Sequence, residues 1–148
     1  GGTVNMATCP ETDQYIARIR WTADPEVLSM LRLNRHQDRL DISHARAGTG
    51  ESRVVYSEQN QYYISEPSDQ TITYLPDGER AILISEKDGF YHLYLMDYQT
   101  GSIQPITSGP YDIDAFLGHG LHHHRIYLFP GLIPADNAFA LPLAKLSR

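Results

Sequence analysis

The histidines near the end of the chain have the most obvious potential for chemistry, because imidazole nitrogens bind divalent metals. His119 is followed by three consecutive histidines at positions 122–124. Adjacent side chains of an extended chain point to opposite faces, so only alternate members of this run could share one ion. No Asp, Glu or Cys stands at a spacing typical of structural zinc. We therefore expect a solvated loop here and no metal site.

Three other histidines are candidates for acid–base chemistry. His92 alternates with Tyr91 and Leu93 in an expected strand, which favours a hydrogen-bonded structural histidine over a catalytic one. His36 and His44 have no nearby partner that could form a catalytic dyad. We expect both of them at the surface.

A nucleophilic serine is the second chemistry to consider. The α/β-hydrolases present their serine on a Gly-x-Ser-x-Gly turn between a strand and a helix, and this pattern does not occur in the sequence. Ser102 and Ser108 stand beside glycines, but both lie in expected β-turns. The sequence therefore predicts no catalytic residue and no cofactor, and the chain is not expected to be an enzyme on its own.

Aromatic side chains offer weaker candidates for ligand binding. Tyr62 with Tyr63, and Tyr91 with Tyr94, could form a stacking surface for peptide aromatics or sugars. Packing between sheets is the favoured interpretation, because inner strands must fill the space between them. Trp21 is also expected in the core.

Two groups of charged residues are interpreted as solvated. The run Glu86-Lys87-Asp88 stands at the tip of an expected hairpin. Five arginines alternate with apolar residues and stand near aspartates, which is typical of the polar face of a sheet with weak local ion pairs. These arginines are Arg18, Arg20, Arg32, Arg35 and Arg39.

Length and composition restrict the class of protein. A chain of 148 residues with 41% hydrophobic and 20% charged residues is typical of one globular domain. The net charge of −6 argues against a nucleic-acid partner, and no apolar stretch approaches the roughly 18 residues of a membrane helix. The single cysteine, Cys9, cannot form an internal disulfide.

The secondary-structure elements that must position these side chains are indicated by an internal repeat in the sequence. Pro25 and Pro76 lie 51 positions apart, and the same offset places apolar residues on apolar residues and a Thr-Gly pair on a Thr-Gly pair. Asp77-Gly78 and Asp88-Gly89 are hairpin dipeptides, because glycine accepts a positive φ at low cost. Each unit reads as four short strands. They span residues 15–21, 28–34, 39–45 and 52–57 in the first unit, and 71–75, 80–85, 90–98 and 102–107 in the second.

Residues 24–31 are the best candidate for a helix. Asp24 could cap it, with Pro25 at its first position. The repeat favours the other interpretation, in which Pro25 lies in a turn that leads into a strand.

Four strands at a period of 40 to 50 residues are typical of a β-propeller blade. A third unit is indicated at residues 113–117, 125–129 and 138–143. We therefore predict an all-β chain that forms one partial domain, residues 1–148, of about two and a half blades of an incomplete propeller. Its blades would span about 15–57, 71–107 and 113–143. A two-sheet β-sandwich uses a similar number of strands but does not explain the fixed offset.

Several stretches resemble the N-terminal propeller domain of dipeptidyl peptidase IV-like serine peptidases, in particular the bacterial forms. The most specific stretch is Asp-Gly-Phe-Tyr-His-Leu-Tyr-Leu at 88–95, and Ile-Thr-Ser-Gly-Pro-Tyr-Asp-Ile at 106–113 is similar to the family's opening of a new blade. Further matching stretches lie at 15–22, 31–35 and 75–78, of which Leu-Pro-Asp-Gly at 75–78 is weak on its own because it recurs in many propellers. The resemblance covers about residues 15–118.

The resemblance implies a two-part serine exopeptidase that releases N-terminal dipeptides, typically after proline or alanine. A propeller admits and anchors the peptide, and an α/β-hydrolase domain cuts it. The family's paired glutamates, which bind the substrate ammonium, have no counterpart because no Glu-Glu pair occurs here. Residues 62–69 stand where the family has a pocket-lining loop. The substrate-binding residues of this chain stay unknown at this level.

The likeness stops near Gly118. Residues 119–148 depart from the family pattern and contain Pro130, Pro134 and Pro142, each of which would remove a donor from a strand ladder. We interpret this stretch as an atypical ending.

The expected function is that of a non-catalytic propeller segment of such a peptidase. The alternatives are a stand-alone propeller-type protein-binding module and a carbohydrate-binding β-sandwich. By resemblance we expect a periplasmic or secreted location and a peptide substrate of the parent enzyme. We also expect self-association through open blade faces, since exposed apolar sheet faces favour it.

Overall fold

The computed structural model describes residues 13–120, 125–130 and 139–142, in which every regular element is a β-strand. Strand formation agrees with the apolar runs and with the glycines and prolines that punctuate them. The strands in chain order are β1 (Gln14–Trp21), β2 (Val27–Asn34), β3 (Arg39–Arg46), β4 (Ser52–Gln59), β5 (Ile72–Tyr74), β6 (Arg80–Ser85), β7 (His92–Asp97), β8 (Ser102–Pro105), β9 (Ile113–Gly120), β10 (Arg125–Pro130) and β11 (Phe139–Pro142).

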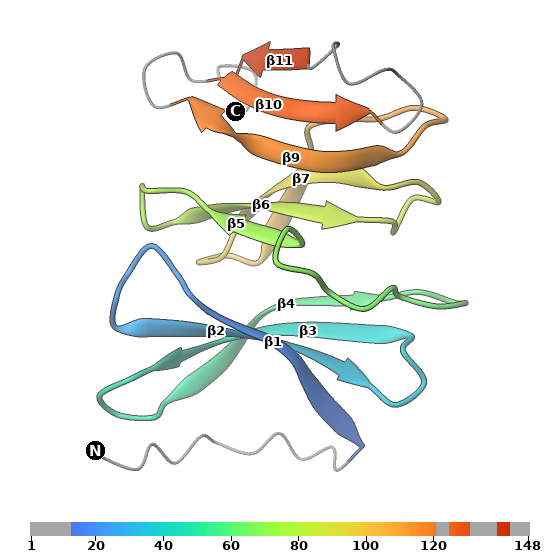
Figure 1. The fold of residues 1–148 in the computed structure, drawn as a ribbon. Coiled ribbons are helices and arrows are strands. Elements are labelled where there is room, and N and C mark those ends of the chain that lie inside the picture. The colour runs from blue at the N-terminus through green and yellow to red at the C-terminus, as the bar shows by residue number, and fades with distance from the viewer. Residues whose placement is uncertain (1–12, 121–124, 131–138, 143–148) are drawn as a thin grey trace.

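These strands form three antiparallel sheets that stack face to face (Figure 1). The first sheet has the order β1-β2-β3-β4, the second has the order β5-β6-β7-β8, and the third contains β9, β10 and β11. Each sheet is built from consecutive strands, as in a propeller blade. The prediction of four-stranded antiparallel blades is confirmed, and three stacked sheets exclude the two-sheet sandwich.

The inner strands β6 and β7 of the second sheet are buried on both faces because their side chains alternate between two cores. Ala81 and Leu83 of β6 face the first sheet, whereas Ile82 between them packs toward β9. In β7, Met96 faces the first sheet and Leu95 faces the third. This alternation explains why β6 reads as an almost unbroken apolar run rather than as an alternating strand.

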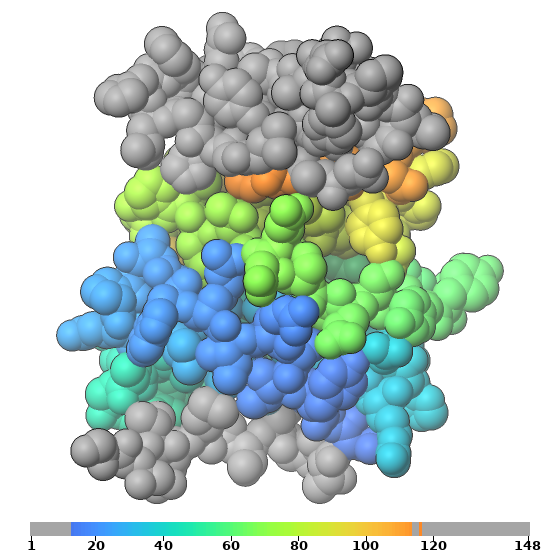
Figure 2. Space-filling view, viewed as in Figure 1, coloured from blue at the N-terminus to red at the C-terminus, as the bar shows by residue number. Residues whose placement is uncertain are grey.

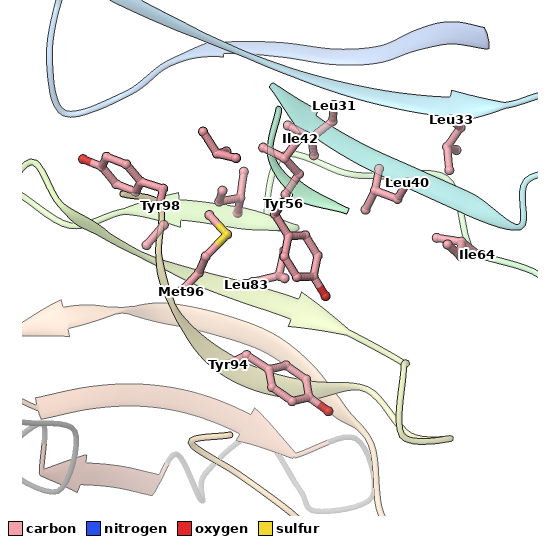
Figure 3. Packing of buried hydrophobic residues seen from close by; sticks show 13 residues of the cluster. Leu31, Leu33, Leu40, Ile42, Tyr56, Ile64, Leu83, Tyr94, Met96 and Tyr98 are labelled. Atoms are coloured by element: carbon pink, nitrogen blue, oxygen red, sulfur yellow. The ribbon is translucent and has the colours of Figure 1, made fainter. Parts of the chain in front are cut away.

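The larger core lies between the first and second sheets (Figure 3). Ile42 of β3 and Leu83 of β6 are fully buried there, and Ile64 from the loop after β4 closes one end. The remaining members come from both sheets. They are Leu31, Leu33, Leu40, Val55, Tyr56, Ile72, Ala81, Tyr94, Met96 and Tyr98.

The segment around Pro25 is a turn rather than a helix. The amide of Val27 donates to the carbonyl of Asp24 at 3.1 Å, and the amide of Glu26 donates to Asp24 Oδ1 at 2.9 Å. Strand β2 follows immediately, so the turn interpretation is confirmed. Gly78 and Gly89 have φ values of 74° and 94°, which confirms the two hairpin dipeptides.

We expect Gly101→Ala to lower the free energy of unfolding by about 2 kcal/mol. Gly101 has φ 76°, where an L-residue costs about 1 kcal/mol, and an added Cβ would lie 3.0 Å from the backbone oxygen of Val55 in the neighbouring sheet. Gly78→Ala is the matched control, since its φ is 74° and its Cβ would meet no atom within 4 Å. We expect about 1 kcal/mol for the control. Urea denaturation measures both, and equal losses would contradict the close approach at Val55.

Candidate functional site

A loop at residues 60–71 carries the chain from β4 in the first sheet to β5 in the second, and it forms one wall of the candidate site. Figure 2 shows this segment (green) against the first strands of the chain (blue). Arg20 of β1 holds the loop, because its Nη1 donates to the carbonyl of Asp69 at 2.9 Å and also to that of Ile72. Arg18 adds an ion pair with Asp69 at 3.6 Å. The loop is therefore tied to the sheet beneath it.

A cavity of about 300 Å³ lies under this loop, between the first two sheets. Its lining is partly apolar, with Leu40 and Ile84, and its polar lining consists of carboxylates, hydroxyls and the amide of Gln70. The carboxylates are those of Glu58, Glu66 and Glu86, and the hydroxyls are those of Ser65, Ser68, Thr71, Ser85 and Tyr91. We call this space the loop cavity.

Glu58 is the most buried charged group of the loop cavity, with 7% of its surface exposed. Its Oε2 accepts hydrogen bonds from Tyr56 Oη at 3.0 Å and from Ser85 Oγ at 2.7 Å. Burial, followed by the charge of Glu58, raises the pKa of Tyr56 well above its ordinary range. Tyr56 therefore stays protonated and donates, and Glu58 joins β4 to β6 across the seam between the sheets.

Glu86 joins the loop to the second sheet in a similar way. Its Oε1 accepts from the amide of Ser65 at 3.1 Å and from Ser65 Oγ at 3.4 Å. Tyr91 Oη donates to the same Ser65 Oγ at 2.6 Å, and burial is the main cause that raises the pKa of Tyr91. The site thus has two carboxylates, each held by hydroxyl or amide donors from neighbouring strands and loops.

The prediction of a plain solvated turn at residues 86–88 was wrong for Glu86, which is partly buried and binds Ser65. Lys87 and Asp88 are exposed as expected. Both also contact Tyr94: Asp88 Oδ2 accepts from Tyr94 Oη at 2.6 Å, and Lys87 Nζ lies 5.6 Å from the centre of the Tyr94 ring. The hairpin tip folds back on its own strand, which the sequence pattern does not reveal.

The predictions for the aromatic residues were correct for some positions and wrong for others. Tyr94 is 2% exposed and packs in the core as expected, and Tyr91 is partly buried. Tyr62 and Tyr63 are 81% and 49% exposed, so packing between sheets was the wrong interpretation for them. Trp21 is also exposed, at 55%, because it lies at the end of β1, the edge strand of its sheet.

Whether each histidine is buried depends on the residues that contact it in the fold rather than on its neighbours in the sequence. His92 is buried as a structural histidine, with its Nδ1 3.1 Å from Thr107 Oγ1 and its Nε2 2.9 Å from the carbonyl oxygen of Gly109, which confirms that prediction. His36 is exposed as expected. His44 is only 6% exposed, so its expected surface position was wrong. Its burial comes from contacts with the second sheet, about thirty residues further along the chain.

The metal candidate falls largely outside the described residues. His119 belongs to β9, whereas positions 122–124 are not among the residues described. Within the described ranges, no group of three His, Cys, Asp or Glu residues could hold a metal ion. In the same ranges, no helix is long and apolar enough to cross a membrane.

The serines considered as nucleophiles have ordinary turn surroundings. Ser102 begins β8, and its Oγ lies 3.0 Å from Thr100 Oγ1 rather than beside a histidine. Ser108 is exposed in the loop after β8. The arrangement offers hydroxyls and carboxylates for binding, and within the described part of the chain neither serine hydroxyl is hydrogen-bonded to a histidine; His92 bonds to the two neighbours of Ser108 instead.

The arginines were interpreted as a polar sheet face with local pairs, and the structure confirms this only in part. Arg35 pairs with Asp13 at 3.5 Å on the surface, and Arg39 pairs with buried Asp41 at 3.3 Å. Arg32 donates to Ser43 Oγ at 2.7 Å. Arg18 and Arg20 instead reach the loop between the sheets.

Sequence reasoning missed Glu58, the central carboxylate of the loop cavity. One signal was present: Tyr56 and Glu58 are two positions apart in a strand, so they share a face. A charged residue on the same face as an apolar strand position indicates a buried, hydrogen-bonded carboxylate. The partner Ser85 has no such signal, because it comes from another sheet.

Comparison with known families agrees with the stacked four-stranded sheets. Residues 1–129 match the family described as the dipeptidyl peptidase IV (DPP IV) N-terminal region. The chain belongs to this family. The match includes both complete four-stranded sheets of this DPP IV N-terminal region, all of β9, and β10 except for its last residue, Pro130.

Solved structures show the same fold. Dipeptidyl peptidase 4 of Porphyromonas gingivalis is 22% identical with a TM-score of 0.80, and the match covers 94% of this chain and 20% of that one. A protein described as a dipeptidyl aminopeptidase IV from Bacteroides ovatus is 25% identical with a TM-score of 0.73, over 83% of this chain and 20% of that one. TolB from Acinetobacter baumannii is 15% identical with a TM-score of 0.55, over 82% and 28%. This DPP IV N-terminal region spans about a fifth of the length of the first two structures.

Proposed function

We propose that the chain is a non-catalytic β-propeller segment of a DPP IV-like serine exopeptidase. The observation that carries the proposal is the match of residues 1–129 to the DPP IV N-terminal region, on a structure of stacked four-stranded sheets. The release of N-terminal dipeptides would then belong to an α/β-hydrolase domain outside these residues. Its chemistry needs a Gly-x-Ser-x-Gly turn, which this sequence does not contain.

The role of the segment would be to restrict access and to support the substrate's N-terminal end. The loop at residues 62–69 supports this proposal, since Tyr62 and Tyr63 are exposed and directly precede Ile64, the first residue of this loop that lines the loop cavity. Aromatic side chains bind peptide groups through large, rigid contact areas. The partner is accordingly a peptide, and the location of the parent enzyme would be periplasmic or secreted. Self-association through open blade faces stays a prediction.

We expect this chain to show no measurable hydrolysis of a Gly-Pro chromogenic amide. The reason is that neither Ser102 nor Ser108 has the strand–turn–helix context of a hydrolase nucleophile. The measurement is the release of chromophore by the purified chain, compared with buffer. Turnover that survives a second, independent purification would contradict the non-catalytic role.

The experiment that tests the proposal as a whole is to sequence the genomic DNA on both sides of the coding region. A paired-glutamate segment upstream and a Gly-x-Ser-x-Gly turn downstream, in the same reading frame, are the expected result. Stop codons on both sides without these motifs would overturn the peptidase role, and the stand-alone binding module would then replace it.

A further inference from the structure

The seam between the first two sheets is closed, away from the loop cavity, by a chain of hydrogen bonds centred on a histidine. His44 of β3 and Ser29 of β2 are cross-strand partners, so their side chains leave the first sheet together. Tyr74 of β5 lies over both of them. Its Oη is 2.8 Å from His44 Nε2 and donates to Ser29 Oγ at 2.7 Å. We call these three residues the histidine joint.

The hydrogen-bond directions determine which nitrogen of His44 carries the proton. Tyr74 uses its only hydroxyl proton in the bond to Ser29, so its oxygen can only accept from His44. His44 Nε2 must therefore be the N–H, and the neutral ring has its lone pair on Nδ1. Burial is the main cause that raises the pKa of Tyr74, which keeps the hydroxyl protonated.

The ring is enclosed by aromatic groups rather than by acids. Its centre lies 5.4 Å from that of Tyr74 and 4.9 Å from that of Tyr98, and the latter pair meets edge to face. Tyr98 follows β7 and is 5% exposed. An imidazolium in such surroundings would lose hydration without gaining a counter-charge in contact with it.

The charged groups around the joint also disfavour an imidazolium. Arg53 of β4 lies beside it and donates through Nη2 to the carbonyl of Tyr98 and to Gln99 Oε1, both at 3.2 Å. Burial first, and then the charge of Arg53, lower the pKa of His44 from 6.5 to about 4.

A cavity of about 330 Å³ borders His44 and leads to this end of the seam. Its lining includes Arg46, Asp24 and Glu51. The two acids have local partners: Asp24 Oδ1 accepts from the amide of Glu26 at 2.9 Å, and Glu51 Oε2 lies 3.5 Å from Thr49 Oγ1. Water and protons can therefore reach the joint, but these carboxylates are engaged in their own turns.

We propose that the seam between the β1–β4 and β5–β8 sheets is an acid-sensitive joint, held closed by neutral His44 and opened at this end when His44 takes up a proton. A protonated ring has a second N–H, on Nδ1, that must be hydrated. The ring then also carries a positive charge beside Arg53, which is hydrogen-bonded to Tyr98 and Gln99, so these two residues are expected to move away from the first sheet. The device does not depend on the proposed peptidase function.

The sign of the pH dependence follows from the two pKa values. The folded-state pKa is below 6.5, so the unfolded or opened chain binds the proton more tightly. The full stability is present above pH 6.5 and is lost as the pH falls from 6.5 toward 4. Between pH 7.5 and pH 5, the unfolding equilibrium constant should rise about 30-fold through this one group.

The decisive experiment compares the full chain with His44→Gln and His36→Gln in urea denaturation between pH 7.5 and 5. The glutamine amide can donate to Tyr74 as Nε2 does but does not titrate, so His44→Gln should lose the 30-fold dependence. His36→Gln is the matched control, because His36 is exposed, and it should keep the dependence. Equal pH dependence in all three proteins would overturn the proposal.

Two measurements on the unmodified chain keep the proposal testable if His44→Gln does not fold. The first is an NMR titration of the His44 ring, which should have a midpoint near pH 4; a midpoint near 6.5 would overturn the proposal.

The second is amide hydrogen exchange at pH 5 and pH 7.5, corrected for intrinsic rates. Faster exchange at Tyr74 and Tyr98 but not around Ile64 is expected, whereas uniform exchange along the seam would show that no local opening occurs.

Discussion

Replacing Leu83 by alanine is expected to lower the free energy of unfolding by about 3 kcal/mol, the largest effect of a single core substitution here. Leu83 lies in β6, is fully buried, and packs against the first sheet (Figure 3). The substitution removes apolar contacts and leaves a cavity between two sheets that cannot both move inward. Urea denaturation at pH 7.5 measures the loss.

Ile19→Ala is the matched control for Leu83→Ala. Ile19 is also a branched apolar residue in a strand, but it is 55% exposed in β1. We expect a change of about 0.5 kcal/mol, as at other surface positions. Comparable losses in the two variants would contradict the seam between the first two sheets as the main core.

Glu58→Ala is expected to cost about 3 kcal/mol of unfolding free energy. The substitution removes the acceptor of two hydrogen bonds, from Tyr56 at 3.0 Å and from Ser85 at 2.7 Å. Hydrogen bonds to a charged group contribute about 1.5–3 kcal/mol each, and hydroxyls left unpaired add a desolvation cost. Thermal or urea denaturation of the purified variant measures the effect.

Glu66 provides the control, because it lines the same loop cavity but its side chain is exposed. Glu66→Ala should change the stability by less than about 0.5 kcal/mol. A loss for Glu66→Ala as large as that for Glu58→Ala would show that the loop, rather than the hydrogen-bonded carboxylate, stabilises the seam.

The fold could be predicted from the sequence because its signals are local and repeated. The glycines of the Asp-Gly dipeptides have the positive φ that hairpin turns require, and they separate apolar runs whose length is that of one strand. The nearly all-apolar run at 80–84 is typical of a strand buried on both faces, and β6 packs into both cores. These features depend only on residues close together in the sequence and on the alternation of side chains between the two faces of a strand, so the sequence alone reveals them.

The candidate site could not be predicted in the same way, because its contacts join distant segments. His44 was expected at the surface since its partner Tyr74 lies 30 residues away, and Glu58 meets Ser85 across 27 residues. Trp21 and Tyr62 are large aromatic residues of the kind expected in a core, yet both are exposed, because Trp21 lies on an edge strand and Tyr62 on a loop. Which aromatic residue is covered depends on the stacking of sheets, which a single sequence does not specify.

The two-sided burial of the second sheet has a consequence for how this protein can vary during evolution. Deleting or inserting one residue within β6 or β7 would exchange the side chains that face the first and third sheets, so both cores would fail together. Length changes in related genes should therefore fall in the turns or add and remove whole four-strand units. The inner sheets of such a stack have no solvent-exposed face on which a shift of register would be harmless. The length of the protein should therefore change by whole blades rather than by single residues within a strand.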